Sequence, residues 1–260
     1  MILRGLSKNL KEQNWTAIVI EFILLVSGVF FGMQVSNWNA ERVIEKKAAI
    51  FTERLKDDLR EEAWGYEYLI LYNKDILANA DRVLAVMDGD AEMTDEQFVI
   101  SAYRASQYKY NVRQRATYDE MISTGSIDLI ADQTLRKTAV EMYTSRLFDE
   151  ISNDGQKSEY REIFRRSVSK DVQRALLKHC GDRFMEPLDY VLIVKSLDYA
   201  CTLDVPAEKI SAAANSLRSK VDLLPALQFR FADVEIALAD LDFYNPKLNK
   251  NLRKIAGREK

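Results

Sequence analysis

Proline, glycine and cysteine are all scarce in this chain of 260 residues. Its four prolines all lie after residue 186, and it has only nine glycines and two cysteines. Proline interrupts helices and is confined to the edges and bulges of sheets, so its positions limit the fold. The long proline-free stretch predicts long helices and disfavours an all-β domain.

Residues that commonly build reaction centres are also few. His179 is the only histidine, the two cysteines do not form a C-x-x-C pair, and no G-x-S-x-G, P-loop or G-x-G-x-x-G motif is present. A zinc site built from histidine or cysteine needs more ligands than these, and we expect His179 to cap a helix end. The sequence therefore predicts no enzyme activity and no cofactor, and leaves open a metal site made of carboxylates alone.

The chain also lacks a strong excess of charge. Its net charge is −3, with acidic and basic residues interspersed, so no nucleic-acid-binding surface is expected. Hydrophobic residues make up 47% and charged residues 30%, as in ordinary globular proteins. A chain of this length can bury a sizeable core.

One apolar segment stands out near the N-terminus. Residues 17–35 contain a single charged residue, Glu21, and Trp15 and Trp38 flank them. As a helix this segment spans about 28 Å, close to the thickness of the hydrocarbon core of a bilayer, with tryptophans where aromatic belts lie. A cleaved signal peptide is the main alternative, but no Ala-x-Ala site follows the segment. We predict an N-terminal tail at 1–14 and a transmembrane helix at 15–38.

The membrane orientation follows from two opposing observations. A count of basic residues favours the C-terminal side of the helix as cytoplasmic. Long domains, however, cross membranes largely regardless of charge, and short basic N-terminal tails tend to stay inside. We expect a cytoplasmic N-terminus and the large domain on the other side.

Small and polar residues form a ridge on this helix. Gly28 and Gly32 make a G-x-x-x-G motif that Ser36 extends, and Glu21 lies seven residues before Gly28. Such ridges allow close helix packing, which predicts self-association with Glu21 near the seam. The alternative is that small residues are simply common in membrane helices, and that Glu21 reaches the interface near Trp15.

The remainder reads as helical. Apolar residues three or four apart predict a long amphipathic helix from 40 to about 87, which continues from the membrane helix and ends at the turn 88–90. Thr94 and Gln97 form a capping box for the next helix. A short helix follows at 117–124, closed by Gly125.

Longer helices are expected beyond this point. Asp132 caps a helix that runs to about His179, with a potential break at 153–155. Pro187 opens a helix to Tyr199, although 190–194 also suits a short strand. Pro206 opens a last long helix through Leu241, which Pro225 kinks, and the basic residues after it are expected to fray.

These patterns predict an all-α fold: a transmembrane helix continuing into a long amphipathic helix, then an up-down helical bundle. The expected domain boundaries are a bundle at 39–245 and a basic C-terminal tail at 246–260.

Two passages resemble a family of uncharacterised bacterial single-pass membrane proteins, the domain of unknown function numbered six-zero-nine-zero. Its membrane-helix pattern is G-E-I-x-L-V-x-x-G-I-x-I-A-x-Q-x-N-N-W-N-x-x-R. Glu21, Gly28, Gln34, Asn37, Trp38 and Arg42 match it, while Ile20 and Ser36 depart from it. A second pattern, T-[FY]-x-E-L-x-x-S-G-x-L-x-L-I, resembles residues 117–130.

The resemblance covers the first half of the chain well. It implies that Glu21, Gln34, Asn37 and Trp38 work as a unit and that the chain is a bacterial membrane protein. With the orientation expected above, the chain would lie in the inner membrane with the bundle in the periplasm. It implies no activity.

Two further features carry hypotheses. Cys180 and Cys201 are 21 residues apart, and in an oxidising periplasm they would form a disulfide worth about 3 kcal/mol. Basic residues at helical spacing form a stripe that faces either an anionic surface or solvent. The stripe comprises Arg161, Arg165, Arg166, Lys170 and Arg174.

The leading functional hypothesis is a membrane-anchored scaffold or accessory subunit, which contacts the lipid bilayer, self-associates through its transmembrane helix and binds an unknown protein partner. The alternative is a membrane-tethered ligand-sensing module without its own output domain. An enzyme is the third and least favoured hypothesis.

Overall fold

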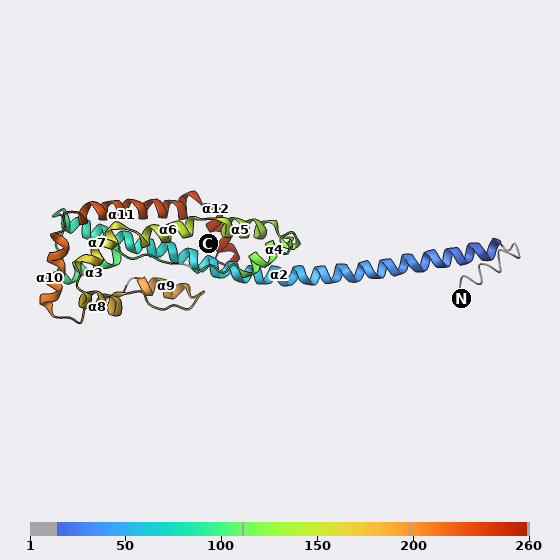
Figure 1. The fold of residues 1–260 in the computed structure, drawn as a ribbon, viewed down its shortest axis with the longest axis horizontal. Helices are drawn as coiled ribbons and strands as arrows, with labels where there is room; N and C mark the ends of the chain where they lie inside the picture. Colours follow the sequence, from blue (N-terminus) through green and yellow to red (C-terminus); the bar gives the residue numbers. More distant parts are fainter. Residues whose placement is uncertain (1–14, 111, 198, 259–260) are drawn as a thin grey trace.

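One very long helix organises the molecule. The structure, a computed structural model, describes residues 15–110, 112–197 and 199–258, which contain helices and no strand. Helix α2 (Trp15–Met87) runs without a break through 73 residues (Figure 1). The prediction of an all-α fold with a continuous N-terminal helix is confirmed.

The two ends of α2 have different surroundings. Its N-terminal part projects alone from the rest of the molecule (Figure 1), and its most apolar 18-residue window, of mean hydropathy 2.2, has no buried residue. This part is long and apolar enough to cross a membrane. From Phe51 onward the helix becomes the centre of the bundle, where Leu55 and Leu59 are fully buried.

The other helices pack around the C-terminal half of α2. They are α3 (Asp95–Ala105), α4 (Ala116–Ser123), η1 (Ile127–Leu129), α5 (Gln133–Thr144), α6 (Leu147–Gln156), α7 (Glu159–Ser167), α8 (Lys170–Cys180), α9 (Tyr190–Leu197), α10 (Ala207–Arg218), α11 (Leu223–Leu238), the π-helical turn η2 (Ala239–Tyr244) and α12 (Pro246–Ile255).

Local sequence signals explain several helix ends. Thr94 and Gln97 form the predicted capping box of α3, and the Asp132 carboxylate accepts from two backbone N–H groups at the start of α5. Gly125 follows α4 with φ of +62°, a conformation that glycine adopts without strain. These three predictions are confirmed.

The single helix expected from Asp132 to His179 is wrong, because the chain forms α5, α6, α7 and α8 there. The breaks fall at Ser145, at Lys157–Ser158 and at Val168–Ser169, and residues 153–155 lie inside α6. Serine favours helix starts because its hydroxyl competes for backbone hydrogen bonds. Three of these short helices each direct an aromatic residue into the core, namely Tyr143 of α5, Phe148 of α6 and Phe164 of α7.

Proline positions explain two further corrections. The expected last long helix is divided into α10 and α11, and Pro225 lies in the first turn of α11, where a missing N–H removes no helical hydrogen bond. Pro187 precedes a turn, so α9 begins only at Tyr190, and the strand alternative is wrong.

The expectation that the C-terminal residues fray is also wrong. Helix α12 packs on α2 and α5, with Leu248 and Leu252 buried. Arg258 then forms an ion pair with Glu67 of α2, with Nη2 and Oε1 3.1 Å apart.

The core divides along α2. Near the projecting end, Phe51 to Ile70 pack against residues of α4, α5 and α12. At the far end, Ala80 and Val83 pack with residues of α3, α7, α8 and α10. Figure 1 shows α3, α7, α8 and α10 at the end of the bundle opposite the projecting helix.

Candidate functional site

The exposed part of α2 has one distinctive face. At about 100° per residue, Glu21, Gly28 and Gly32 lie within about 40° of one another around the helix, and Ser36 lies at the edge of this group. A Cβ built on either glycine would meet no atom within 4 Å, so among the described residues nothing covers the face at Gly28 and Gly32.

The other polar residues of the segment point elsewhere. Gln34 and Asn37 lie about 140–160° from Glu21 around the helix. Trp38 occupies a third direction, where the Arg42 guanidinium carbon lies 5.0 Å from its ring centroid. Glu21, Gln34, Asn37 and Trp38 therefore do not form one cluster within a single copy of the chain.

The glycine face continues beyond the apolar window. Asn39, Val43 and Ile50 lie within about 40° of Gly32 around the helix. Val43 and Ile50 are each 60% exposed, which is high for large aliphatic side chains. The face thus extends from the apolar window to the base of the bundle.

This face is turned away from the bundle. The first fully buried residues of α2, Leu55 and Leu59, lie about 140° and 180° from Ile50 around the helix. The glycine face is therefore uncovered as far as Ile50, whereas within the bundle the same direction is covered, since Tyr68 lies on that side of α2 and is only 2% exposed.

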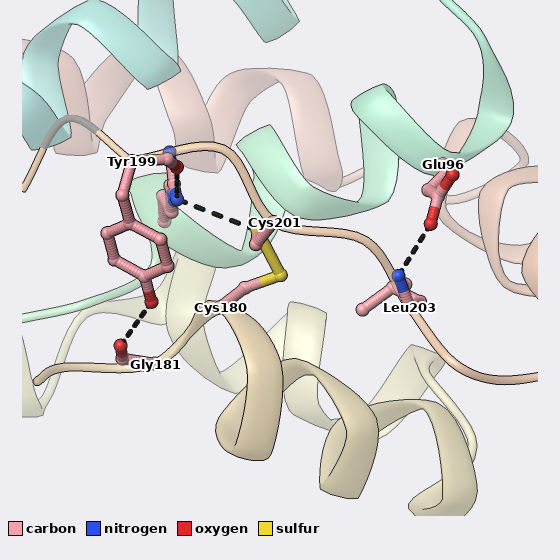
Figure 2. The surroundings of a disulfide bond; sticks show 7 residues. Glu96, Cys180, Gly181, Tyr199, Cys201 and Leu203 are labelled. Atoms are coloured by element: carbon pink, nitrogen blue, oxygen red, sulfur yellow. Dashed lines mark hydrogen bonds between the residues drawn. A yellow bond between two sulfur atoms is a disulfide. The ribbon is translucent and has the colours of Figure 1, made fainter.

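A second feature lies at the far end of the bundle. Cys180, the last residue of α8, is joined to Cys201 by a disulfide, with the two Cα atoms 5.4 Å apart (Figure 2). The bond encloses the segment that carries α9. Cys180 is buried among residues of α3, α8 and α10.

Hydrogen bonds hold the same segment beside the disulfide. The Tyr199 hydroxyl donates to the carbonyl of Gly181, and the backbone N–H of Leu203 donates to Glu96 Oε1 at 2.6 Å (Figure 2). Arg104 Nη2 donates to the Tyr199 carbonyl at 2.8 Å. The disulfide is therefore part of a well-packed junction between α3, α8 and the non-helical segment before α10.

The basic stripe is divided by the structure. Arg161, Arg165, Lys170 and Arg174 line one groove at the junction of α7 and α8. Arg166 does not line it, and its guanidinium forms an ion pair with Glu162 one helical turn earlier. His179 lies in the last turn of α8 and is half-buried.

An aromatic cavity of about 290 Å³ lies where two loops cross α2. Trp64, Tyr68, Lys109 and Phe184 are among its lining residues, and Lys109 Nζ lies 4.6 Å from the Tyr68 ring centroid. Burial lowers the pKa of Lys109. Sequence reasoning missed this cavity because its residues come from separate loops, and each alone resembles an ordinary core or surface residue.

A buried ion pair was also missed. Glu62 of α2 accepts from Arg113 Nε at 3.0 Å and from the backbone N–H of Gln114 at 2.6 Å. Burial raises the pKa of Glu62, and the neighbouring guanidinium offsets only part of that effect. The single signal in the sequence was an acidic residue on the apolar side of the predicted long helix.

The hydroxyl groups of the turn after α4 form hydrogen bonds within the chain. Lys47 Nζ donates to the Ser126 hydroxyl at 3.0 Å, and the Thr124 hydroxyl donates to the Glu120 carbonyl at 2.8 Å. Throughout the ranges that the structure describes, no three His, Cys, Asp or Glu residues lie together as potential metal ligands.

The described residues form an all-helical protein built on one long helix, and the N-terminal part of this helix is apolar and exposed. The family model described as "Family of unknown function (DUF6090)" matches residues 21–197, more than half of the chain. The chain belongs to this family. No curated protein and no solved structure matches it.

Proposed function

We propose that this chain is a single-pass membrane protein that acts as a scaffold or accessory subunit through protein contacts. The observation that carries the proposal is the continuity of α2, which is apolar with no buried residue in its apolar window at one end and forms the centre of the bundle at the other. A bilayer accounts for the apolar end, because each large apolar side chain kept out of water contributes about 1.5–3 kcal/mol.

Self-association is the second part of the proposal. In a parallel pair of copies, the face with Gly28 and Gly32 would meet its counterpart, and Val43 and Ile50 would extend the seam toward the bundles. The seam would end near Ile50, because beyond that point α2 is surrounded by its own bundle, with Tyr68 buried on the same side. In this arrangement the exposed side chains of Val43 and Ile50 would pack against the second copy.

The proposed location is a bacterial inner membrane, with a cytoplasmic N-terminus and the bundle in the periplasm. The disulfide supports this orientation, because such bonds persist in oxidising compartments and are rare in the cytosol. The disulfide also separates this orientation from its reverse, in which the two cysteines would be free thiols.

Topology reporters test the proposal directly. Alkaline phosphatase and a fluorescent protein that matures only in the cytoplasm are fused in turn after residue 258. The proposal expects phosphatase activity and no fluorescence, with the protein retained in the membrane fraction after a carbonate wash. Release of the bundle into the soluble periplasm would identify residues 15–38 as a cleaved signal, and fluorescence would reverse the orientation.

A ligand-sensing module is the second candidate, and the aromatic cavity beside Trp64 and Tyr68 favours it. Its volume is at the lower limit of those that hold small ligands. A sensor would be stabilised against heat by its ligand, and Trp64→Ala would abolish that stabilisation. A scaffold would show no such response in a screen of small molecules.

A further inference from the structure

Four basic side chains surround a groove at the far end of the bundle. Arg161 and Arg165 come from α7, and Lys170 and Arg174 come from α8. The groove encloses about 420 Å³, within the range of small-molecule sites. Its inner surface includes Phe164, which is 1% exposed, and Leu177 lies at its edge.

Two of the three acidic residues of α7 and α8 form ion pairs with residues that do not line the groove. Glu162 pairs with Arg166, and Asp171 pairs with Lys209 of α10, with Oδ2 and Nζ 2.6 Å apart. No carboxylate belongs to the residues that line the groove in the described chain. The positive charge of the groove is therefore not neutralised by its own lining.

Arg161 makes more contacts within the chain than the other three cationic side chains of the groove. It is half-buried, its Nη1 donates to the Ser106 carbonyl at 2.8 Å, and its guanidinium carbon lies 4.8 Å from the Tyr108 ring centroid. Burial, followed by the charge of Arg165, lowers the pKa of Arg161. A bound anion would relieve both effects.

The corner that presents the groove is rigid. Gln173 Nε2 of α8 donates to the carbonyls of Arg165 and Val168, at 2.8 Å and 2.7 Å. These bonds fix the end of α7 against the first turns of α8. The backbone positions that carry Arg165, Lys170 and Arg174 are thus fixed relative to one another before any ligand binds.

The position of the groove separates it from the bilayer. Its core residues pack with Ala80 and Val83 near the C-terminal end of α2. Ala80 lies about 63 Å along the helix axis from Trp38, where the proposed membrane segment ends. A lipid headgroup of the same membrane would not reach the groove.

We propose that this groove binds a soluble small molecule that carries a phosphate-like dianion on an apolar body. Arg165, Lys170 and Arg174 bind the charged group, and the apolar body packs over Phe164 and against Leu177. The anion site itself concerns only the α7–α8 corner, whereas the choice of a soluble ligand over a lipid rests on the proposed membrane segment.

The test uses the full chain in nanodiscs of neutral phosphatidylcholine and 1-naphthyl phosphate as the probe, with binding measured by calorimetry. The groove variant carries Arg165→Gln, Lys170→Gln and Arg174→Gln, all at exposed positions. The control variant carries Arg166→Gln, Lys178→Gln and Lys220→Gln, which remove the same charge outside the groove. Circular dichroism verifies that both variants are folded.

The proposal expects the groove variant to bind the probe at least tenfold more weakly than the wild type and the control variant to stay within about twofold, since each tenfold is about 1.4 kcal/mol. Neutral 1-naphthol and inorganic phosphate should each bind at least tenfold more weakly than the probe. No binding by the wild type, or equal losses in both variants, would overturn the proposal.

Two further binding experiments distinguish a soluble small molecule from other ligands of the groove. Tenfold weaker probe binding in nanodiscs that contain phosphatidic acid would assign the groove to lipid headgroups. Tighter binding of a penta-glutamate peptide than of the probe, lost in the groove variant, would assign it to an acidic protein segment. Either result would overturn the choice of a soluble small molecule.

Discussion

Arg113 and Glu62 form an ion pair in which Nε and Oε2 are 3.0 Å apart and the side chains are only 13% and 2% exposed. Arg113 also donates to the Met142 carbonyl, so the guanidinium joins α2, α5 and the loop before α4. A buried carboxylate whose partner is removed is left without compensation, which costs about 3–5 kcal/mol.

The first prediction follows from this pair. Arg113→Ala should lower the free energy of unfolding by about 3 kcal/mol or more, measured by urea denaturation with circular dichroism in mild detergent. Arg115→Ala is the matched control, because its pair with Asp119 is about half exposed and such pairs contribute about 1 kcal/mol or less. Equal losses in the two variants would contradict the assignment.

The second prediction concerns Gly155 inside α6. A Cβ there would lie 2.6 Å from Tyr108 Cβ and 3.2 Å from Arg230 Nη2. Alanine favours helix by about 1 kcal/mol over glycine, but this overlap with a backbone-anchored carbon requires movement of the chain. Gly155→Ala should therefore lower the melting temperature, whereas Asn153→Ala, at an exposed position of α6, should leave it unchanged or slightly raised.

The third prediction concerns the disulfide. Closing the loop between Cys180 and Cys201 stabilises the fold by about 3 kcal/mol in the chain-entropy model. The double variant with Cys180→Ser and Cys201→Ser should melt several degrees below the wild type. A reductant should lower the melting temperature of the wild type and leave that of the variant unchanged, and a wild type insensitive to reductant would contradict the prediction.

The fourth prediction is an alkaline loss of stability through Tyr160. Burial raises the pKa of Tyr160 well above its ordinary value, and its hydroxyl donates to the Ala102 carbonyl at 3.0 Å. The unfolded chain loses this proton near pH 10 while the folded chain retains it, so stability is full below that pH and falls as pH rises above it.

Denaturation at pH 8 and pH 11 checks this sign. Tyr160→Phe should lose about 1 kcal/mol at pH 8, where the hydrogen bond is missing, but its stability should fall less between the two pH values. Tyr244→Phe alters a tyrosine that is 68% exposed and should decline as the wild type does. Identical declines in the wild type and Tyr160→Phe would contradict the prediction.

The fifth prediction tests the glycine face of α2. Gly28→Leu with Gly32→Leu should abolish the dimer detected by cross-linking in membranes, because the branched side chains separate the two helices. Ser27→Leu with Gln34→Leu places the same side chains about 120–140° away and should preserve the dimer. A chain that is monomeric in both variants and in the wild type would contradict self-association.

The sequence predicts the parts of the fold that local chemistry decides. The stripe from Phe51 to Val83, the capping box at Thr94 and the cap at Asp132 each depend on residues within one or two helical turns. Their structures match the predictions because propensity and burial favour the same result there.

The breaks at Ser145, Ser158 and Ser169 were not predictable in this way. Apolar residues recur three or four positions apart across Ser145 and Ser169, so the pattern alone extends one helix there, whereas residues 152–159 between Ile151 and Tyr160 carry no large apolar side chain. The breaks depend on distant partners, as when Phe148 packs edge-on against Tyr66 with ring centroids 5.4 Å apart. The groove was missed for the same reason, because its cations converge only after the chain turns between α7 and α8.

The unbroken course of α2 has a mechanical consequence. A helix of 73 residues is about 110 Å long and, without proline or an internal break, has no hinge at which a displacement would dissipate. A rotation or piston movement imposed on the end near Glu21 would therefore be transmitted along one continuous helix toward Leu55 and Val83. One continuous helix thus connects the core of the bundle to the N-terminal end of α2.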